Sequence, residues 1–354
     1  MRIKTFILAW AMMAWAAGAS AGAAAGELLG LWECAATDEA EAMRWEFLPG
    51  GGCLRMRFVP ELGDGAWVYA KDQESSYETK DGVVKIQWKN AAGNPGAAEY
   101  RLAGGAAEKG AAPALTMVPR QGQEEIAKLM HGKWRMARMD NRELPTDHIS
   151  CVFTFIDEKT VMVSSSTKIM FSMAGLPVWT MRRKLPHRLE GNRVTWEEPG
   201  ATYMVIIHHI DDKKLLYGLL MAKKGAPFRP VGMVECQRVN VDYAQEVLGL
   251  WEGVSSSGHL VNGDHNFRME FRGDGRYRYW SKTDAGFQLD SEEMNEYGVD
   301  GDLLMTRWFE NGAVERREWW LLAIDGDTMR FYARRRNFNG QLVDGAITLK
   351  RVKK

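Results

Sequence analysis

The feature that most constrains the fold is a Gly-x-Trp motif that occurs three times, each time after an apolar pair. The three copies read Leu28-Leu29-Gly30-Leu31-Trp32, Leu129-Met130-His131-Gly132-Lys133-Trp134 and Val247-Leu248-Gly249-Leu250-Trp251. They are roughly one domain length apart, and a third full length follows the last copy. The period therefore predicts three domains, each with its own core.

The copies also end alike, because residues 115–120, 234–238 and 347–351 alternate apolar and polar residues and finish on Arg. This alternation predicts a half-buried closing strand. Between the two ends, short apolar segments are separated by turn residues such as Asp81-Gly82 and Asp300-Gly301. The pattern predicts an all-β protein of three tandem small antiparallel up-and-down β-barrels.

The first barrel is expected to be shortened. Residues 210–215 and 324–329 form matching hairpin signals in the second and third copies, whereas the first copy has a Gly/Ala-rich stretch at 103–112. We expect a signal peptide at 1–21, barrel 1 at 22–121, barrel 2 at 122–240 and barrel 3 at 241–354.

The N-terminus is typical of a secretory signal, because Arg2 and Lys4 precede an apolar run at 6–17 and small residues continue to Ala21. This run is too short for a spanning helix, which needs about 20 apolar residues. We expect an exported protein, periplasmic or secreted, without a transmembrane segment. The chain has 46 Lys and Arg residues against 46 Asp and Glu, so it lacks the excess of positive charge that would indicate nucleic acid as a partner.

Four cysteines, Cys34, Cys53, Cys151 and Cys236, fall two each in the first two copies. Export permits disulfides. The expected strands place one strand between the members of each pair, a separation of about 10 Å that exceeds the reach of a disulfide. The geometry favours thiols and leaves the bridges as the alternative.

A Gly-x-Trp on the first strand with an Arg at the end of the last strand resembles the lipocalin-like pattern of the calycin superfamily. The resemblance spans nearly the whole chain after the signal. It implies that each Trp plugs one barrel end and that an Arg lies across its face, a cation–π contact of about 0.5 to 2 kcal/mol. The implied pairs are Trp32 with Arg120, Trp134 with Arg238 and Trp251 with Arg351.

Two groups of residues are candidates for a ligand or partner surface. Tyr277 and Tyr279 alternate on an expected strand of barrel 3 and point inward, where core filling is the simpler interpretation. Residues 169–179 are apolar without alternation and predict a flap over barrel 2, with a bent strand pair as the alternative. Four side chains of this segment are the candidates: Phe171, Met173, Leu176 and Trp179.

No catalytic or metal-binding motif stands out. Successive strand residues such as His208 and His209 should point to opposite faces, and no Gly-x-Ser-x-Gly elbow or phosphate loop is present. We therefore expect no enzyme, no cofactor and no metal, but a non-enzymatic binding protein of the cell envelope for an unknown small apolar molecule or protein. The alternatives are a protein–protein interaction module, such as a secreted protease inhibitor or surface scaffold, and an unrecognised hydrolase.

Overall fold

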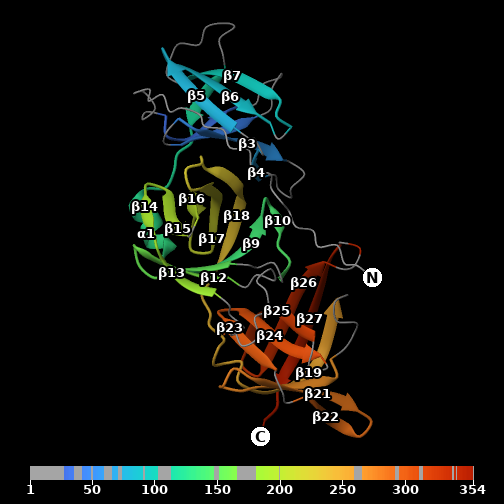
Figure 1. The fold of residues 1–354 in the computed structure, drawn as a ribbon. Coiled ribbons are helices and arrows are strands. Elements are labelled where there is room, and N and C mark those ends of the chain that lie inside the picture. The colour runs from blue at the N-terminus through green and yellow to red at the C-terminus, as the bar shows by residue number, and fades with distance from the viewer. Residues whose placement is uncertain are drawn as a thin grey trace.

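The structure is a computed structural model, and it shows three curled, largely antiparallel β-sheets stacked in chain order (Figure 1). The described part contains one α-helix, α1 (Gln123–Met130). The all-β prediction of three tandem barrels is confirmed. The described residues are 28–35, 42–48, 51–59, 66–70, 74–90, 92–102, 113–146, 151–165, 181–198, 200–258, 265–291, 295–310, 314–336, 339 and 341–353.

Barrel 1 is an eight-stranded sheet in the order β4-β3-β2-β1-β8-β7-β6-β5. Its first and last strands are therefore neighbours, as an up-and-down barrel requires. The strands are β1 (Gly30–Cys34), β2 (Met43–Phe47), β3 (Cys53–Val59), β4 (Ala66–Tyr69), β5 (Glu74–Lys80), β6 (Val83–Lys89), β7 (Pro95–Leu102) and β8 (Ala114–Met117).

Barrel 2 follows the order β13-β12-β11-β9-β18-β17-β16-β15-β14, and β10 pairs with β9 beside this path. The first and last strands, β9 and β18, again pair with each other. The strands are β9 (Gly132–Met139), β10 (Arg142–Glu143), β11 (Cys151–Phe155), β12 (Thr160–Ser165), β13 (Met181–Pro186), β14 (Arg188–Glu190), β15 (Arg193–Glu198), β16 (Ala201–Ile210), β17 (Lys214–Lys223) and β18 (Arg229–Val239).

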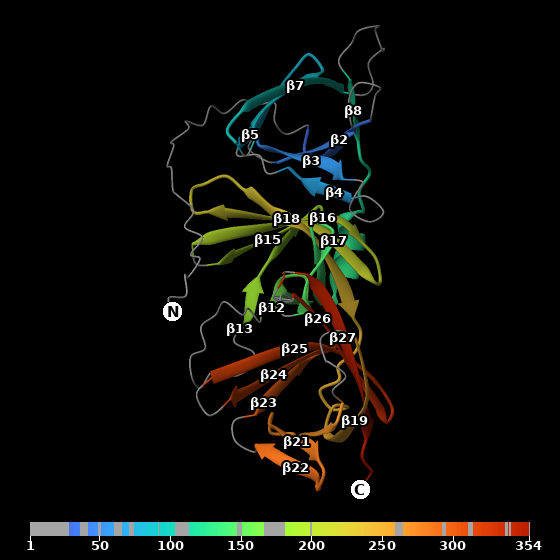
Figure 2. The same cartoon turned by 90° about the vertical axis from the view of Figure 1, so that its right-hand side faces the viewer.

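Barrel 3 repeats this order as β22-β21-β20-β19-β27-β26-β25-β24-β23. The sheets of barrels 2 and 3 are seen at the centre and bottom of Figure 2. The strands are β19 (Gly249–Gly258), β20 (Phe267–Phe271), β21 (Tyr277–Thr283), β22 (Gly286–Ser291), β23 (Glu296–Asp300), β24 (Leu303–Glu310), β25 (Val314–Asp325), β26 (Thr328–Arg336) and β27 (Leu342–Arg351).

Each sheet has its two edges at the same point of the meander, between β4 and β5, β13 and β14, or β22 and β23. Backbone hydrogen bonds join these two edge regions in barrels 1 and 3. They are Tyr77 N to Gly51 O at 3.4 Å in barrel 1, and Tyr297 N to Gly275 O at 2.8 Å and Tyr277 N to Asn295 O at 3.2 Å in barrel 3. In barrel 2 the edge strands β13 and β14 are linked by the single residue His187.

Barrel 1 is shortened as expected. β7 pairs directly with β8, whereas barrels 2 and 3 place β17 and β26 before the closing strand. Losing one strand from an antiparallel meander leaves the closing strand parallel to its new neighbour, and β7 and β8 are indeed parallel, with Arg101 opposite Ala114.

Each barrel is filled by its own apolar cluster, which includes the motif residues Trp32, Trp134 and Trp251. Cys34, Cys53 and Cys236 lie among these buried residues as thiols. One strand separates the members of each cysteine pair, because β2 lies between β1 and β3, and β9 lies between β11 and β18.

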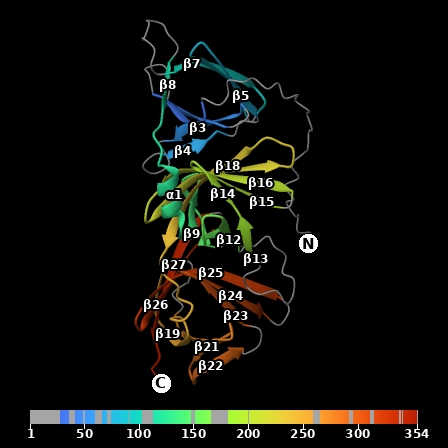
Figure 3. The same ribbon diagram turned by 90° about the vertical axis from the view of Figure 1, so that its left-hand side faces the viewer.

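The junction of barrels 1 and 2 is apolar. Outer faces of both sheets share one cluster, and β4 lies against the β16–β18 part of barrel 2 (Figure 3). Burying such side chains stabilises a protein by about 1.5 to 3 kcal/mol each. The buried members are Leu31, Leu48, Leu54, Met56, Tyr69, Met204, Ile206, Leu220 and Met233.

The junction of barrels 2 and 3 is polar. The turn from β23 to β24 reaches β9, where Lys133 pairs with Asp300 and Arg135 donates to both oxygens of Asp302 at 3.1 Å. Beside β10, the Thr146 hydroxyl donates to the Arg334 carbonyl at 3.1 Å. This junction therefore depends on directional contacts.

Candidate functional site

The three motif tryptophans make the same hydrogen bond. Each indole Nε1 donates to the backbone carbonyl four residues earlier, and the glycine two residues before each Trp has a positive φ of 112° to 120° that favours glycine. The bonds are Trp32 to Leu28 at 3.1 Å, Trp134 to Met130 at 2.8 Å and Trp251 to Val247 at 2.7 Å. The motif is a folded turn that is built identically three times.

The closing arginines of barrels 2 and 3 lie over these tryptophans. The guanidinium carbon of Arg238 is 4.2 Å from the ring centre of Trp134, and that of Arg351 is 4.1 Å from Trp251. Each arginine also donates to two backbone carbonyls of the turn before its Trp. Stacking and hydrogen bonding together tie the last strand to the first.

Barrel 1 departs from the pairing of Trp32 with Arg120. The strand register places Met117 opposite Trp32, where the other barrels have their arginine. β8 ends at Met117, and Arg120 lies beyond Pro119 and pairs with Glu46 of β2 instead. The expected contact between Trp32 and Arg120 is wrong, because the sequence match aligned the Arg three residues too late.

Arg120 and Glu46 form a buried ion pair at the junction of barrels 1 and 2. Glu46 is 0% exposed, and burial raises the pKa of its carboxyl while the Arg120 charge opposes this rise. Glu46 Oε1 and Arg120 Nε are both buried without a hydrogen-bond partner. A pair with unsatisfied atoms of this kind is costly to break from either side.

Tyr69 of barrel 1 contacts His208 of barrel 2 beside this pair. The hydroxyl of Tyr69 lies 3.2 Å from His208 Nε2, and the tyrosine ring packs so closely against Gly218 that a Cβ there would overlap the hydroxyl. Burial, with repulsion from Arg120 and Arg44, lowers the pKa of His208 to about 3. His208 is therefore neutral at physiological pH.

A cavity of about 340 Å³ lies at this junction and has walls from both barrels. The volume is at the lower end of the range for small-molecule sites, about 300 to 1,000 Å³. The lining residues are Leu31, Arg44, Met56, Ala66, Trp67, Val118, Pro119, Arg120, Asn141, His208, His209, Lys214, Leu216, Met233 and Glu235.

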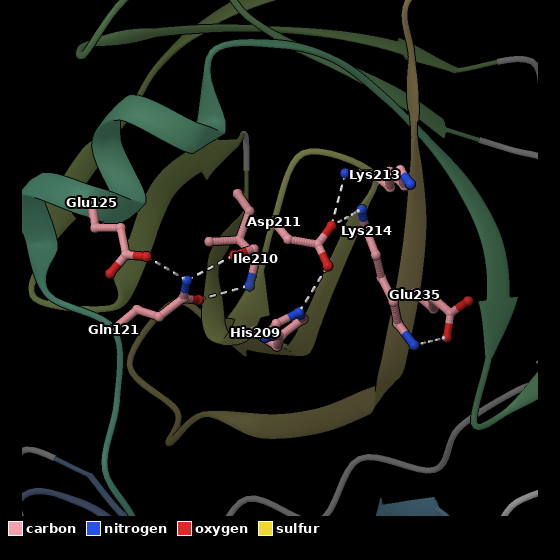
Figure 4. Close-up of polar contacts among 8 residues, drawn as sticks. All are labelled: Gln121, Glu125, His209, Ile210, Asp211, Lys213, Lys214 and Glu235. Atoms are coloured by element: carbon pink, nitrogen blue, oxygen red, sulfur yellow. Dashed lines mark hydrogen bonds and ion pairs between the residues drawn. The ribbon is translucent and has the colours of Figure 1, made fainter.

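The linker between barrels 1 and 2 is hydrogen-bonded to the β16–β17 hairpin (Figure 4). The Gln121 side chain donates to the Ile210 carbonyl at 2.7 Å and accepts from the Ile210 amide at 2.8 Å. Asp211 accepts from the amides of Lys213 and Lys214, and these bonds, with His209, lower its pKa to about 2. The hairpin that carries His209 and Lys214 is thereby braced at its turn.

A β-bulge changes the expected geometry of the two histidines. The register of β16 against β17 shifts between Ile207 and His209, so strict alternation fails there. Both His208 and His209 line the cavity, which corrects the prediction that they face opposite sides. His209 pairs with Asp211 at 3.1 Å, and among the described residues no cluster of His, Cys, Asp and Glu could hold a metal ion.

Tyr277 and Tyr279 belong to the core of barrel 3. Tyr277 is 5% exposed, Tyr279 stacks on Phe267 at 5.3 Å, and burial raises the pKa of Tyr277 above its ordinary range. The other surface candidates, Phe171, Met173, Leu176 and Trp179, lie outside the described residues.

A second, more open hollow of about 630 Å³ lies at the ends of β5, β6 and β7. It is lined mainly by small and uncharged side chains around Trp88, whose ring packs against Trp45 at 5.4 Å and lies under Arg55 at 5.0 Å. This hollow has walls from barrel 1 alone, whereas the smaller cavity has apolar walls from both barrels beside a buried ion pair. The smaller cavity is therefore the better candidate for a site.

Sequence reasoning missed Glu46, Arg44, Tyr69 and the cavity. Glu46 alternates with inward-facing Trp45 and Phe47, so a single barrel would leave it in solvent. Glu46 is buried because barrel 2 covers this face of barrel 1, and the residue pattern of a single strand cannot indicate such a contact. The Gly-rich turn signals and the Trp motif located the barrels but not the faces that meet.

No helix in the described part of the chain is both long and apolar enough to cross a membrane. No protein family model matches the chain, and no curated protein matches its sequence. Among solved structures, it is similar to a protein of unknown function from the DUF3598 family of Nostoc punctiforme, with 11% identity and a TM-score of 0.19 over 66% of this chain and 100% of that one. This likeness is too slight to carry an argument, so the function is argued from the site itself.

Proposed function

We propose that this protein is a non-enzymatic binding protein, exported to the cell envelope, that holds a small and largely apolar ligand between barrels 1 and 2. The observation that carries the proposal is the cavity of about 340 Å³ at that junction. The signal-like N-terminus supports export, since basic residues, an apolar run and small residues follow in the usual order.

The chemistry of the walls supports an apolar ligand. Leu31, Met56 and Trp67 come from barrel 1, and Leu216 and Met233 come from barrel 2. Small-molecule sites usually combine such apolar walls with a few polar groups that orient the ligand. Methionine side chains adapt their shape, which suits a site between two bodies.

The barrel interiors argue for a site outside them. Each described interior is occupied by aromatic and aliphatic side chains, including fully buried Trp45, Trp134 and Trp251. Barrels of about eight strands have interiors that side chains can fill. The junction, where two convex faces meet, leaves space that the interiors do not.

We also propose that the three barrels are lipocalin-like. The stacking of Arg238 on Trp134 and of Arg351 on Trp251 supports this assignment, as does the pairing of first and last strands in each sheet. Ligand binding at a junction between barrels would then be a departure from a barrel-interior site.

The test is saturable binding of phenylnaphthylamine, an uncharged aromatic probe that becomes fluorescent in apolar sites. Val118→Trp fills the cavity and should abolish binding. Val231→Trp is the matched control, because Val231 is 41% exposed and does not line the cavity. Thermal unfolding of both variants shows that they are folded.

The proposed function would be wrong if the folded wild-type protein bound no probe saturably. It would also be wrong if Val118→Trp and Val231→Trp bound the probe equally well. The second result would place the probe elsewhere on the molecule.

A further inference from the structure

The charged groups of the cavity between barrels 1 and 2 are unevenly placed. Three cationic side chains line it, Arg44, Arg120 and Lys214, against one carboxylate, Glu235. Lys214 and Glu235 pair with each other at 2.8 Å. Arg44 and Arg120 pair with Glu33 and Glu46, which do not belong to the lining.

Arg44 lies on the cavity wall and has more N–H donors than its contact with Glu33 uses. Its Nε and Nη2 both contact one oxygen of Glu33, each at 2.8 Å, and its guanidinium lies 4.3 Å from the ring centre of Trp67. A guanidinium has five N–H donors, and one carboxylate oxygen does not use them all. The group is one-quarter exposed, so a ligand can reach it.

Arg120 adds a second donor that lacks an acceptor. Its Nε is buried without a hydrogen-bond partner, although its Nη2 pairs with Glu46. A buried donor without an acceptor is unfavourable, and an anionic oxygen is the strongest acceptor that could relieve it. A purely apolar ligand would leave Arg120 unsatisfied.

A cationic ligand fits this lining poorly. It would meet Arg44 and Arg120 at close range, and the lining carboxylate, Glu235, is already neutralised by Lys214. Like charges in a site of low dielectric repel strongly. The lining therefore favours an amphiphilic molecule, whose apolar part contacts the apolar walls and whose anionic end contacts the cationic groups.

We propose that the ligand is a small amphiphile with an anionic head group, which lies against Arg44 and Arg120 while its apolar part contacts Trp67, Leu216 and Met233. This inference rests on the proposed function and names the ligand class for the same site. Charge-assisted hydrogen bonds to a guanidinium supply the selectivity, and apolar burial supplies most of the affinity.

The experiment compares two fluorescent probes that differ by one anionic group, anilinonaphthalene sulfonate and phenylnaphthylamine. Arg44→Met should weaken binding of the sulfonate about tenfold relative to the uncharged amine, the loss expected for one charge-assisted hydrogen bond. Arg44→Lys should restore part of the difference. Arg57→Met on the neighbouring strand is the control, since Arg57 is exposed and does not line the cavity.

A second variant gives the opposite effect and cannot be explained by misfolding. Glu33→Gln removes the carboxylate that competes for Arg44, so it should strengthen sulfonate binding about threefold or more and leave the amine nearly unaffected. Added salt should weaken binding of the sulfonate more than binding of the amine.

The two proposals fail in different ways. Saturable binding of the amine together with equal responses of both probes to Arg44→Met and Glu33→Gln would overturn the anionic head group and leave the binding site in place. Absence of binding for both probes would overturn the proposed function itself.

Discussion

Barrels 1 and 2 meet through apolar side chains and one buried ion pair, whereas barrels 2 and 3 meet through several ion pairs around a tight turn. The first junction is shaped by side-chain volume, and imperfect filling leaves a cavity there. The second is shaped by directional bonds from Lys133 and Arg135 to Asp300 and Asp302. The difference indicates that the first junction is suited to hold a ligand and the second to fix an orientation.

The missing strand of barrel 1 connects this difference to the repeat. Because β8 follows β7 directly and ends at Met117, Arg120 does not reach Trp32 and instead lies at the junction with Glu46. In barrels 2 and 3 the corresponding arginines stack on their tryptophans. In the barrel that lacks one strand, the closing arginine, Arg120, therefore does not stack on the motif Trp but lines the proposed site.

The largest effect is expected for Arg120→Met, which leaves Glu46 charged and buried without a partner. The loss of stability should be about 3 to 5 kcal/mol, typical of a broken buried ion pair. Denaturant unfolding measures it, and lowering the pH should recover part of the loss because the lone carboxyl can take up a proton.

The double variant Glu46→Leu with Arg120→Met is the control for that experiment. It removes both charges and should be much more stable than Arg120→Met alone. If the single and double variants were equally unstable, the loss would come from packing and not from an unpaired charge.

The next effect is an acid sensitivity of the first junction that depends on His208. Its folded pKa of about 3 lies below the ordinary histidine value of 6.5, so the unfolded chain binds a proton more readily. The stability due to His208 is complete above pH 6.5, falls as the pH drops, and stops falling near pH 3. The slope is at most about 1.4 kcal/mol per pH unit.

The difference between wild type and His208→Asn isolates this contribution. Glu46 acts in the opposite direction, because its raised pKa favours the folded state as the pH falls. Subtracting the two stability profiles cancels Glu46 and the other shared groups. A difference that stays constant between pH 6.5 and 3 would show that His208 is accessible to protons in the folded state.

Two glycines allow a matched comparison of the junctions. A Cβ at Gly218 would overlap the Tyr69 hydroxyl, and one at Gly301 would approach Val239 Cγ1 to 2.5 Å at a φ of +68°. Alanine at either position should cost about 1 to 3 kcal/mol through overpacking. Gly301→Ala should be the more harmful, because a left-handed backbone costs a residue with a Cβ about 1 to 2 kcal/mol more.

Gly82→Ala is the reference for that comparison. Gly82 has a φ of +75°, and a Cβ added there would have no neighbouring atom within 4 Å, so its loss of stability measures the backbone cost alone. Denaturant unfolding of the three variants separates strain from overlap. If Gly301→Ala lost no more stability than Gly82→Ala, the side chains of the second junction would be able to move aside for the added Cβ at no cost.

The sequence was sufficient for the all-β architecture of three tandem barrels and for the shortening of the first. The Gly-x-Trp turns, the alternating closing strands and the lack of one hairpin signal at 103–112 led to this prediction, and the sheet orders agree with it. These features are local, because each depends on residues a few positions apart or on neighbouring strands. The parallel pairing of β7 with β8 follows from the same omission.

The site could not be read from the sequence for two physical reasons. Leu31, Glu46 and Met56 alternate with inward-facing residues and therefore look solvent-exposed until another barrel covers them. The Arg at position 120 matches its counterparts in pattern, but Pro119 and the end of β8 move it out of register. Both errors arise from contacts between domains, for which a single sequence has no periodic signal.

The smallest effect is expected at the second junction and concerns salt. Lys133 and Asp302 are each 20% exposed, whereas their partners Asp300 and Arg135 are buried. Salt reaches the exposed member of each pair and should weaken the pair by about 0.2 to 1 kcal/mol. The first junction depends mainly on apolar burial, and its ion pair is buried and so is screened much less; salts of the sulfate type would strengthen it. Limited proteolysis in the linker at 240–245 should therefore become faster in sodium chloride. Cleavage at 118–122 should not, because Val118 is hydrogen-bonded to Leu31 of barrel 1 and Gln121 to Ile210 of barrel 2. Asp302→Asn should reproduce the effect of salt at low ionic strength and make cleavage at 240–245 less salt-dependent.

Equal acceleration at both linkers would contradict the division into an apolar and an ionic junction, since screening would then loosen the first as much as the second.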